Sequence, residues 1–130
     1  MVSSSDGWRP LTPVRVEAFN TSSTSRGSIH DDEKAREMGY RGGLVPGVTV
    51  LAYMTRLLRE EFGHDWSDGA SFHGLIRRPV YEGDLMTVEG EVGEADSAGQ
   101  VSLRLRVVDP EGHVCAAADV QASAAMVGAR

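Results

Sequence analysis

The sequence predicts one α+β domain, in which an antiparallel sheet is wrapped around a central helix. The helix is expected at about residues 48–62 (VTVLAYMTRLLREEF), where the first two turns are apolar on nearly every side. A helix of that composition is normally enclosed by protein. After residue 70, apolar side chains tend to recur at every second position, which is typical of strands with one buried face. A buried helix followed by alternating strands is the basis for this fold class.

The segments before the helix are short. Residues 14–19 (VRVEAF) alternate apolar and polar side chains and predict a strand. The polar residues 20–28 (NTSSTSRGS) predict a loop, and loops of this length often lie at functional sites. Residues 31–39 (DDEKAREMG) predict a short helix with acids in its first turn and a glycine at its end. Residues 41–47 (RGGLVPG) must be irregular, because they hold three glycines and a proline.

Beyond the helix, a polar turn leads into a series of strands. The tetrapeptide DPEG at 109–112 predicts a tight turn before the last strand. Neither an internal repeat nor a linker divides the chain, so we expect one domain over residues 1–130, with residues 1–10 flexible. The expected strands lie within residues 70–84, 85–95, 101–108 and 113–126.

Composition argues against several classes of partner. The formal net charge is −6 and no basic run is longer than Arg77-Arg78, so the chain would repel nucleic acid and acidic membrane surfaces. No apolar run approaches the 18 or so residues of a membrane span, and the N-terminal MVSSSDGWRP has no signal-peptide pattern. Cys115 is the single cysteine, which excludes an intrachain disulfide. We therefore expect a cytoplasmic protein.

Two stretches resemble a known enzyme family. SIHDDEKAREMGYRGGLVPGVTVLAYMTRLL, residues 28–58, is similar to the segment that MaoC-like dehydratases and (R)-specific enoyl-CoA hydratases place between their catalytic loop and their central helix. RRPVYEGDLMTVEGEV, residues 77–92, resembles the turn and strand that follow in the same family. The resemblance implies the hot-dog fold, in which the sheet wraps around one helix.

The resemblance also implies a reaction, the reversible addition of water to the double bond of a 2-enoyl thioester. Such an enzyme is a lyase that needs no cofactor beyond the coenzyme A or acyl carrier protein that bears the acyl chain. His30 matches the family's catalytic histidine, and a histidine can take up a proton from water near neutral pH. Gly47 matches the glycine that begins the central helix, where a backbone N–H can hold the enolate oxygen.

The family's catalytic loop reads Asp-x-Asn-Pro-x-His, and this chain departs from it. When the loop is aligned on His30, Ser25 stands in place of the aspartate. Gly27 and Ser28 stand in place of the asparagine and the proline. A serine cannot act as a carboxylate base near neutral pH. Asp31 is a neighbouring carboxylate with two interpretations: it completes a capping box with Ser28 as the cap, or it orients His30 or a water molecule.

Other residues near these motifs are candidates for binding the substrate. Val45, Val48 and Tyr53 would line an acyl chain if they face a pocket, although core packing explains the same side chains. Arg41 and Arg78 carry guanidinium groups suited to the phosphates of coenzyme A, although solvated charge is the default. The four histidines are dispersed, and no helix carries ligand pairs one turn apart, so we expect no metal site.

Three functions stay open at this point. The first is a hydratase or dehydratase of a thioester-linked acyl chain. The second keeps the pocket and changes the chemistry, to thioester hydrolysis, cyclisation or a tailoring step of polyketide type. The third is a non-catalytic protein that binds an acyl ligand. We also expect a homodimer, because a lone sheet of this kind leaves an edge strand exposed and relatives pair two units to cover it.

Overall fold

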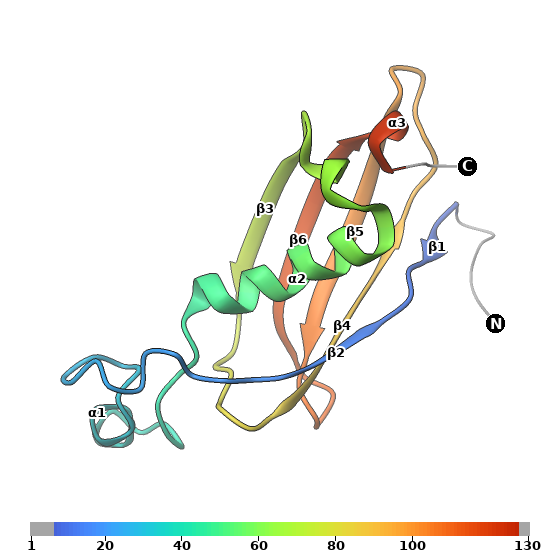
Figure 1. The fold of residues 1–130 in the computed structure, drawn as a ribbon. Helices are drawn as coiled ribbons and strands as arrows, with labels where there is room; N and C mark the ends of the chain where they lie inside the picture. The colour runs from blue at the N-terminus through green and yellow to red at the C-terminus, as the bar shows by residue number, and fades with distance from the viewer. Residues whose placement is uncertain (1–6, 128–130) are drawn as a thin grey trace.

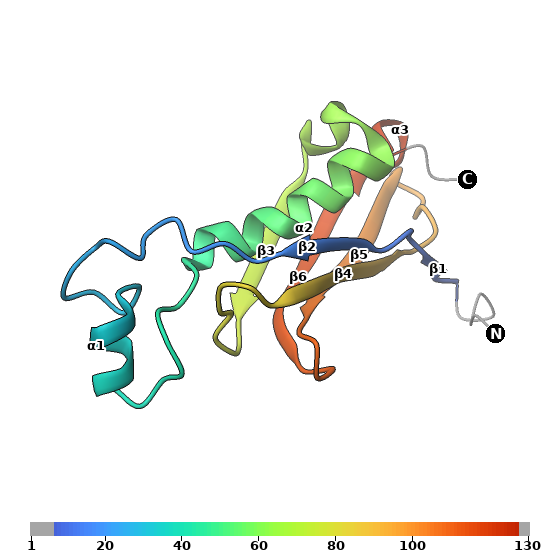
Figure 2. The same ribbon diagram turned by 60° about the horizontal axis from the view of Figure 1, so that its bottom comes forward.

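An antiparallel sheet curves around one long helix, α2 (Gly47–Phe62), in the computed structural model, which describes residues 7–127 (Figure 1). The short helix α1 (Asp32–Glu37) lies beyond one end of α2, away from the sheet (Figure 2). A 3₁₀ helix, η2 (His64–Ser67), follows α2, and α3 (Ala124–Val127) ends the described chain. The six strands are β1 (Arg9–Pro10), β2 (Val14–Glu17), β3 (Ser71–Ile76), β4 (Leu85–Val92), β5 (Gln100–Val108) and β6 (Val114–Ser123).

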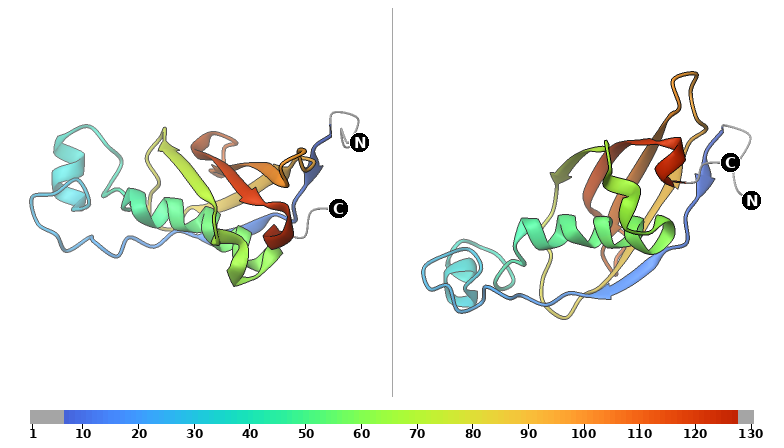
Figure 3. Two further views of the ribbon diagram at one scale, coloured as in Figure 1. Left: turned by 90° about the horizontal axis from the view of Figure 1, so that it is seen from above. Right: turned by 45° about the horizontal axis from the view of Figure 1, so that its top comes forward.

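The strand order is β1-β4-β5-β6-β3, with β2 also paired to β4. β4, β5 and β6 form the predicted meander, in which Val88 lies opposite Val107 and Leu105 opposite Ala118. β3 pairs with β6 rather than with β4, the next strand in the chain. It therefore occupies the edge of the sheet opposite β1, and α2 crosses the concave face between the two edges (Figure 3).

The core lies between α2 and the concave face of the sheet. Val50, Met54, Leu57 and Leu58 on α2 are each at most 1% exposed. β4 and β5 bury every second residue, as the period of two in their sequences predicts. Complete burial of side chains of this size contributes roughly 1.5–3 kcal/mol each. The expectation of a helix packed into the core is therefore confirmed, but α2 is not enclosed on every side, because Val48 (76% exposed) and Ala52 lie open to solvent. Within residues 7–127, no helix combines the length and apolar character that crossing a bilayer requires.

Helix α2 contacts the edge strand β3 at Gly74. A Cβ atom at this position would lie 2.6 Å from Leu51 Cδ2, which is closer than real contacts allow. Glycine at 74 therefore leaves room for the Leu51 side chain of α2. Because side chains alternate along a strand, His73 and Leu75 point to the outer face of the sheet. His73 accordingly lies opposite the exposed Asp119 of β6 and away from α2.

Both ends of the chain differ from what the sequence pattern predicts. The pattern predicts a last strand through residue 126, but β6 ends at Ser123 and the chain turns into α3. Within the first ten residues, which we expect to be flexible, Arg9 and Pro10 pair with Val92 and Glu91 of β4. Residues 1–6 lie outside the described part of the chain.

The outer face of β4 and β5 carries a network of ion pairs. Arg106 contacts Glu91 at 2.6 Å through Nη2 and Glu89 at 2.8 Å through Nε. Arg104 Nε lies 2.9 Å from Glu91 Oε1, and the Arg104 guanidinium stacks 4.0 Å from the centroid of the Trp8 ring. The hydrogen bond from Arg106, followed by that from Arg104, holds the pKa of Glu91 below its ordinary value, although partial burial opposes this.

Glu91→Gln is expected to lower stability at neutral pH and to have little effect in acid. A carboxyl group whose pKa is lower in the folded chain contributes stability above its unfolded pKa of about 4.3, and this contribution is lost as the pH falls through the folded pKa. For a partly exposed network we expect a difference of about 1 kcal/mol or less at pH 7. Urea unfolding from pH 7 to pH 3 measures it. The exposed Glu94, changed to glutamine, is the control; an equal effect of both substitutions at every pH would contradict the prediction.

Candidate functional site

Two segments cross where the loop before α1 meets the turn before α2. The backbone N–H of Leu44 donates to the Ile29 carbonyl at 3.0 Å. The N–H of Gly43 donates to Asp32 Oδ1 at 2.7 Å. The first segment carries His30, and the second leads within three residues to Gly47 at the start of α2. The crossing therefore brings the sequence-predicted histidine to the turn that precedes the central helix.

The His30 ring is held by a main-chain carbonyl. Its Nδ1 lies 2.7 Å from the Leu44 carbonyl oxygen. A carbonyl oxygen can only accept a hydrogen bond, so Nδ1 carries the hydrogen and donates it. In the neutral ring this leaves Nε2 without a hydrogen and able to accept a proton. The side chain is half-buried. Its orientation is set by Leu44, which lies in the segment between α1 and α2.

Asn20 fixes the backbone of the same loop, and sequence reasoning missed it. It is 2% exposed, and within residues 7–127 it is the single buried residue of polar or charged type. Its Nδ2 donates to the His30 carbonyl at 2.8 Å, and its Oδ1 accepts from the N–H of Ser22 at 3.0 Å. Its own N–H donates to Glu82 Oε1 at 3.2 Å. An asparagine between a strand and a polar run carries no local signal of burial, so the sequence assigns it to the loop.

Gly43 is needed where the two segments touch. A Cβ atom built at this position would lie 2.2 Å from the His30 carbonyl oxygen and 3.0 Å from Asn20 Nδ2. The first separation is too short for any side chain and involves main-chain atoms that cannot move aside alone, whereas the second is a tight contact. The sequence predicts an irregular turn here and says nothing about which glycine the contact requires.

The N-terminus of α2 offers hydrogen-bond donors. Gly47 is the first residue of the helix, Pro46 is the N-cap, and no side chain caps this end. The first N–H groups of a helix have no acceptor inside it, and the helix dipole makes this end positive. The Gly47 N–H makes no hydrogen bond within the described part of the chain. This end of α2 also has no acidic residue in its first turn, so it can receive a negatively charged oxygen.

The two other residues predicted for catalysis serve the local backbone. Asp31 is the N-cap of α1, where its carboxylate accepts from the N–H groups of Glu33 at 3.2 Å and Gly27 at 3.3 Å. The predicted capping box with Ser28 as the cap is therefore wrong, because Ser28 lies one turn earlier and its Oγ donates to the Ser25 carbonyl at 2.6 Å. Ser25 is exposed in that turn.

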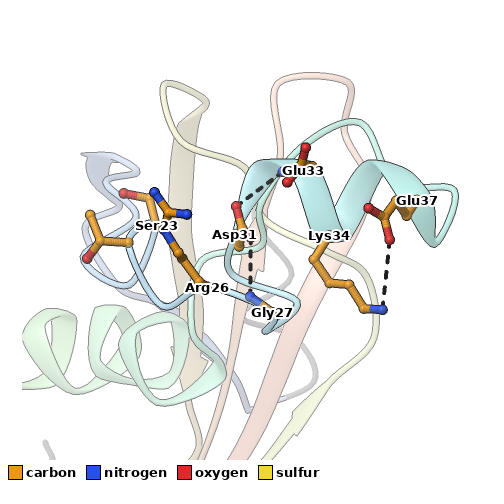
Figure 4. A pocket seen from close by; sticks show the side chains of 8 residues that line it. Ser23, Arg26, Gly27, Asp31, Glu33, Lys34 and Glu37 are labelled. Carbon is orange, nitrogen blue, oxygen red and sulfur yellow. Dashed lines mark hydrogen bonds and ion pairs between the residues drawn. The ribbon is translucent and has the colours of Figure 1, made fainter.

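A polar cavity of about 600 Å³ lies between the loop before α1 and α1 itself. Figure 4 shows Arg26 and Lys34 on its walls together with Asp31, at the start of α1. No apolar side chain lines it, so it does not suit an acyl chain. Neither His30 nor Gly47 belongs to its lining. The lining residues are Ser23, Thr24, Arg26, Gly27, Asp31, Glu33, Lys34 and Glu37.

The three predicted acyl-lining residues divide into two groups. Val45 is 4% exposed and Tyr53 is 8% exposed, and both belong to the hydrophobic core. Burial raises the pKa of the Tyr53 hydroxyl. Val48 is 76% exposed at the first turn of α2, and Ile76 at the end of β3 is 41% exposed. An apolar surface is therefore open to solvent beside Gly47, where a Cβ would lie 3.5 Å from Ile76 Cγ1.

The predicted phosphate-binding arginines have different surroundings. Arg41 pairs with Asp84 at 2.8 Å and stacks 4.2 Å from the centroid of the Tyr81 ring. A phosphate would have to compete with Asp84 for it. Arg78 follows β3 with an exposed side chain, while its backbone N–H donates to the Cys115 carbonyl at 3.1 Å. Of the two, Arg78 is the one whose side chain has no ion pair within the described residues.

Neither a protein-family model nor a curated protein matches the chain, but solved structures do. The ChsH1–ChsH2 complex from Mycobacterium tuberculosis matches with a TM-score of 0.71 and 20% identity, over 88% of this chain and 94% of that one. The (R)-hydratase from A. caviae involved in PHA biosynthesis matches with a TM-score of 0.69 and 17% identity, over 88% and 96%. The chain has the hot-dog fold.

The same fold extends to proteins with other names. A probable thioesterase from Bartonella henselae matches with a TM-score of 0.56 and 14% identity, over 88% of this chain and 90% of that one. Identities this low establish the fold alone, because one fold hosts many reactions. The hot-dog expectation is confirmed, and the choice of reaction depends on the residues described above.

Proposed function

We propose that the chain is a lyase, a hydratase or dehydratase of 2-enoyl and 3-hydroxyacyl thioesters borne by coenzyme A or an acyl carrier protein. One observation carries the proposal: the Leu44 carbonyl holds the His30 ring at 2.7 Å, and Gly47 follows Leu44 by three residues. Three residues span at most about 11 Å. A base and an oxyanion donor are thus tied to one short segment, and these are the two groups that addition of water across the double bond of an enoyl thioester uses.

The proposed step uses both groups together. Nε2 of neutral His30 takes a proton from water, and the water oxygen forms a bond to C3 of the enoyl chain. The electron pair of the double bond moves toward the thioester carbonyl, and the N–H of Gly47 stabilises the enolate oxygen. The imidazolium then returns its proton to C2, which completes the 3-hydroxyacyl product. Dehydration is the same sequence in reverse.

The surroundings of Gly47 support this assignment. A Cβ at this position would make only ordinary contact with Ile76, at 3.5 Å, so packing alone does not require glycine there. A glycine allows a ligand to approach the backbone closely. The exposed apolar side chains of Val48 and Ile76 beside it suit an acyl chain.

Thioester hydrolysis is the second candidate. It is favoured because the carboxylates near His30 are already engaged in backbone hydrogen bonds. The sequence resemblance places Ser25 where the family has aspartate, and Asp31 and Asp32 already accept backbone hydrogen bonds from Gly27, Glu33 and Gly43. Activation of water would then depend on His30 without a carboxylate of the same loop. Hydrolysis can proceed with one general base. Binding of an acyl ligand without catalysis, the third candidate, needs none.

An assay on 2-enoyl-CoA of several chain lengths separates these functions. The proposal expects loss of the conjugated enoyl absorbance without release of free coenzyme A thiol. Thiol release detected with a disulfide reagent would establish the hydrolase instead. If the acyl-CoA binds and is recovered unchanged at every chain length, the chain is a non-catalytic protein that binds an acyl ligand.

We further propose a homodimer formed through β3. This edge strand exposes Leu75 (58%) and Ile76 (41%); unprotected edges of this kind are normally covered. Light scattering is expected to give twice the chain mass of 14.0 kDa. Ile76→Asp should yield monomers, whereas the control Leu85→Asp, at a 50% exposed site on β4, should not. A monomeric wild type would contradict this. The cytoplasmic location stays a prediction.

A further inference from the structure

The Asp109 carboxylate, in the turn between β5 and β6, uses one oxygen for the backbone of the turn and the other for side chains. Asp109 Oδ1 accepts from the N–H groups of Glu111 and His113, both at 2.9 Å, and these bonds close the turn. Asp109 Oδ2 points instead to the ring of His113, 3.3 Å from Nδ1. The Asp109 side chain is 16% exposed, so this oxygen is held in a defined position.

A second carboxylate reaches the same ring. Glu111 Oε1 lies 3.6 Å from His113 Nδ1, and the three atoms from Asp109, Glu111 and His113 all lie within 4.8 Å of one another. In a tetrahedral zinc site with bonds of about 2.0–2.2 Å, neighbouring ligand atoms are about 3.3–3.6 Å apart. The two separations that involve the imidazole therefore already have the lengths that such a site needs.

We propose that Asp109, Glu111 and His113 bind a divalent transition-metal ion of the zinc type. One imidazole nitrogen and two carboxylate oxygens form a ligand set that suits Zn²⁺ and leaves a fourth position for water. The dispersed histidines of the sequence predict no metal site, and this cluster contains one histidine with two carboxylates. The spacing i, i+2, i+4 becomes a cluster only because the chain reverses at this turn.

None of the three proposed ligands is a residue to which we assign hydratase chemistry. Figures 1 and 2 show the turn after β5 and helix α1 on separate parts of the molecule. Cys115 Sγ lies 3.8 Å from Asp109 Oδ2. It is not among the ligand atoms that lie within 4.8 Å of one another, and we leave it outside the ligand set.

Titration of the tag-free full chain with ZnCl₂ in a calorimeter tests the proposal. We expect one Zn²⁺ per chain with a dissociation constant in the micromolar range, at least about 10-fold weaker binding in Glu111→Gln, and no measurable binding in His113→Ala. Asp109 is left intact because it closes the turn. Circular dichroism verifies that each variant is folded.

Two controls make the outcome specific. His64 is an exposed histidine of η2 outside the cluster, and His64→Ala should bind Zn²⁺ as the wild type does. Cys115→Ser should also retain binding. The proposal is overturned if the wild type binds no Zn²⁺ below about 1 mM, if folded His113→Ala binds it unchanged, or if Cys115→Ser abolishes binding.

Discussion

His30→Gln is expected to lower the rate of 2-enoyl thioester hydration at least about 100-fold, because a positioned general acid–base typically contributes 10²–10⁴ in rate. Glutamine carries an amide N–H donor, one bond farther from Cα than His30 Nδ1, the atom that lies 2.7 Å from the Leu44 carbonyl oxygen. It has no nitrogen that can take up a proton at neutral pH. The variant therefore removes the proton acceptor and keeps a hydrogen-bond donor in the side chain. The measurement is kcat/KM on 2-enoyl-CoA, followed by loss of enoyl absorbance.

The matched control is His73→Gln. His73 is exposed, on the outer face of β3 and away from α2, so its replacement should leave kcat/KM unchanged. Thermal unfolding of both variants verifies that the fold is intact. If folded His30→Gln hydrates the substrate at the wild-type rate, the histidine is not the acid–base and the proposed mechanism is wrong.

The architecture follows from the sequence because periodicity is a local property. The apolar first turns of residues 48–62 predict a core helix, and α2 spans Gly47–Phe62 and buries one face. The alternation of VSLRLRVV at 101–108 predicts β5, which runs Gln100–Val108. Pairing is less local: β3 skips its chain neighbour β4 and joins β6, and no pattern within the strand itself specifies that partner.

The hydrogen bonds of Asp31 and Asp32 could not be predicted from the sequence. Ser28 and Asp31 are both good helix caps, and the choice depends on where the backbone first becomes helical. Asp31 has an extended backbone with ψ of 128° directly before α1, which makes it the cap. Asp32 then turns to the Gly43 N–H, a residue eleven positions away. Neither the role of Asp31 as the cap nor the bond from Asp32 to Gly43 can be deduced from the order of the residues.

The roles of Asn20 and Gly43 cannot be predicted from the sequence for the same reason. Each acts on the His30 carbonyl, one by a hydrogen bond of 2.8 Å and the other by close approach. The contacts join positions ten and thirteen residues apart in irregular segments, where neither a period of two nor one of 3.6 exists. Only the folded crossing of the two segments identifies them as parts of the site.

Gly43→Ala is expected to destabilise the fold by about 1–3 kcal/mol, the usual effect of inserting a methyl group where no space exists. The new Cβ would lie 2.2 Å from the His30 carbonyl oxygen and 2.9 Å from its carbon. The two segments must separate, which stretches the bond from His30 Nδ1 to the Leu44 carbonyl. A displacement of about 1 Å at a catalytic group can lower the rate about 100-fold. Urea unfolding and kcat/KM measure the two effects.

Gly42→Ala separates the effect of crowding from that of losing any glycine in the turn. A Cβ at 42 would meet Asp32 Oδ1 at 3.4 Å, an ordinary contact, and alanine reduces the freedom of the unfolded chain. Its stability should stay within about 0.5 kcal/mol of the wild type, with the hydration rate unchanged. Equal losses in both variants would mean that the turn needs flexibility, and that the close contact of Gly43 with the His30 carbonyl does not position the histidine.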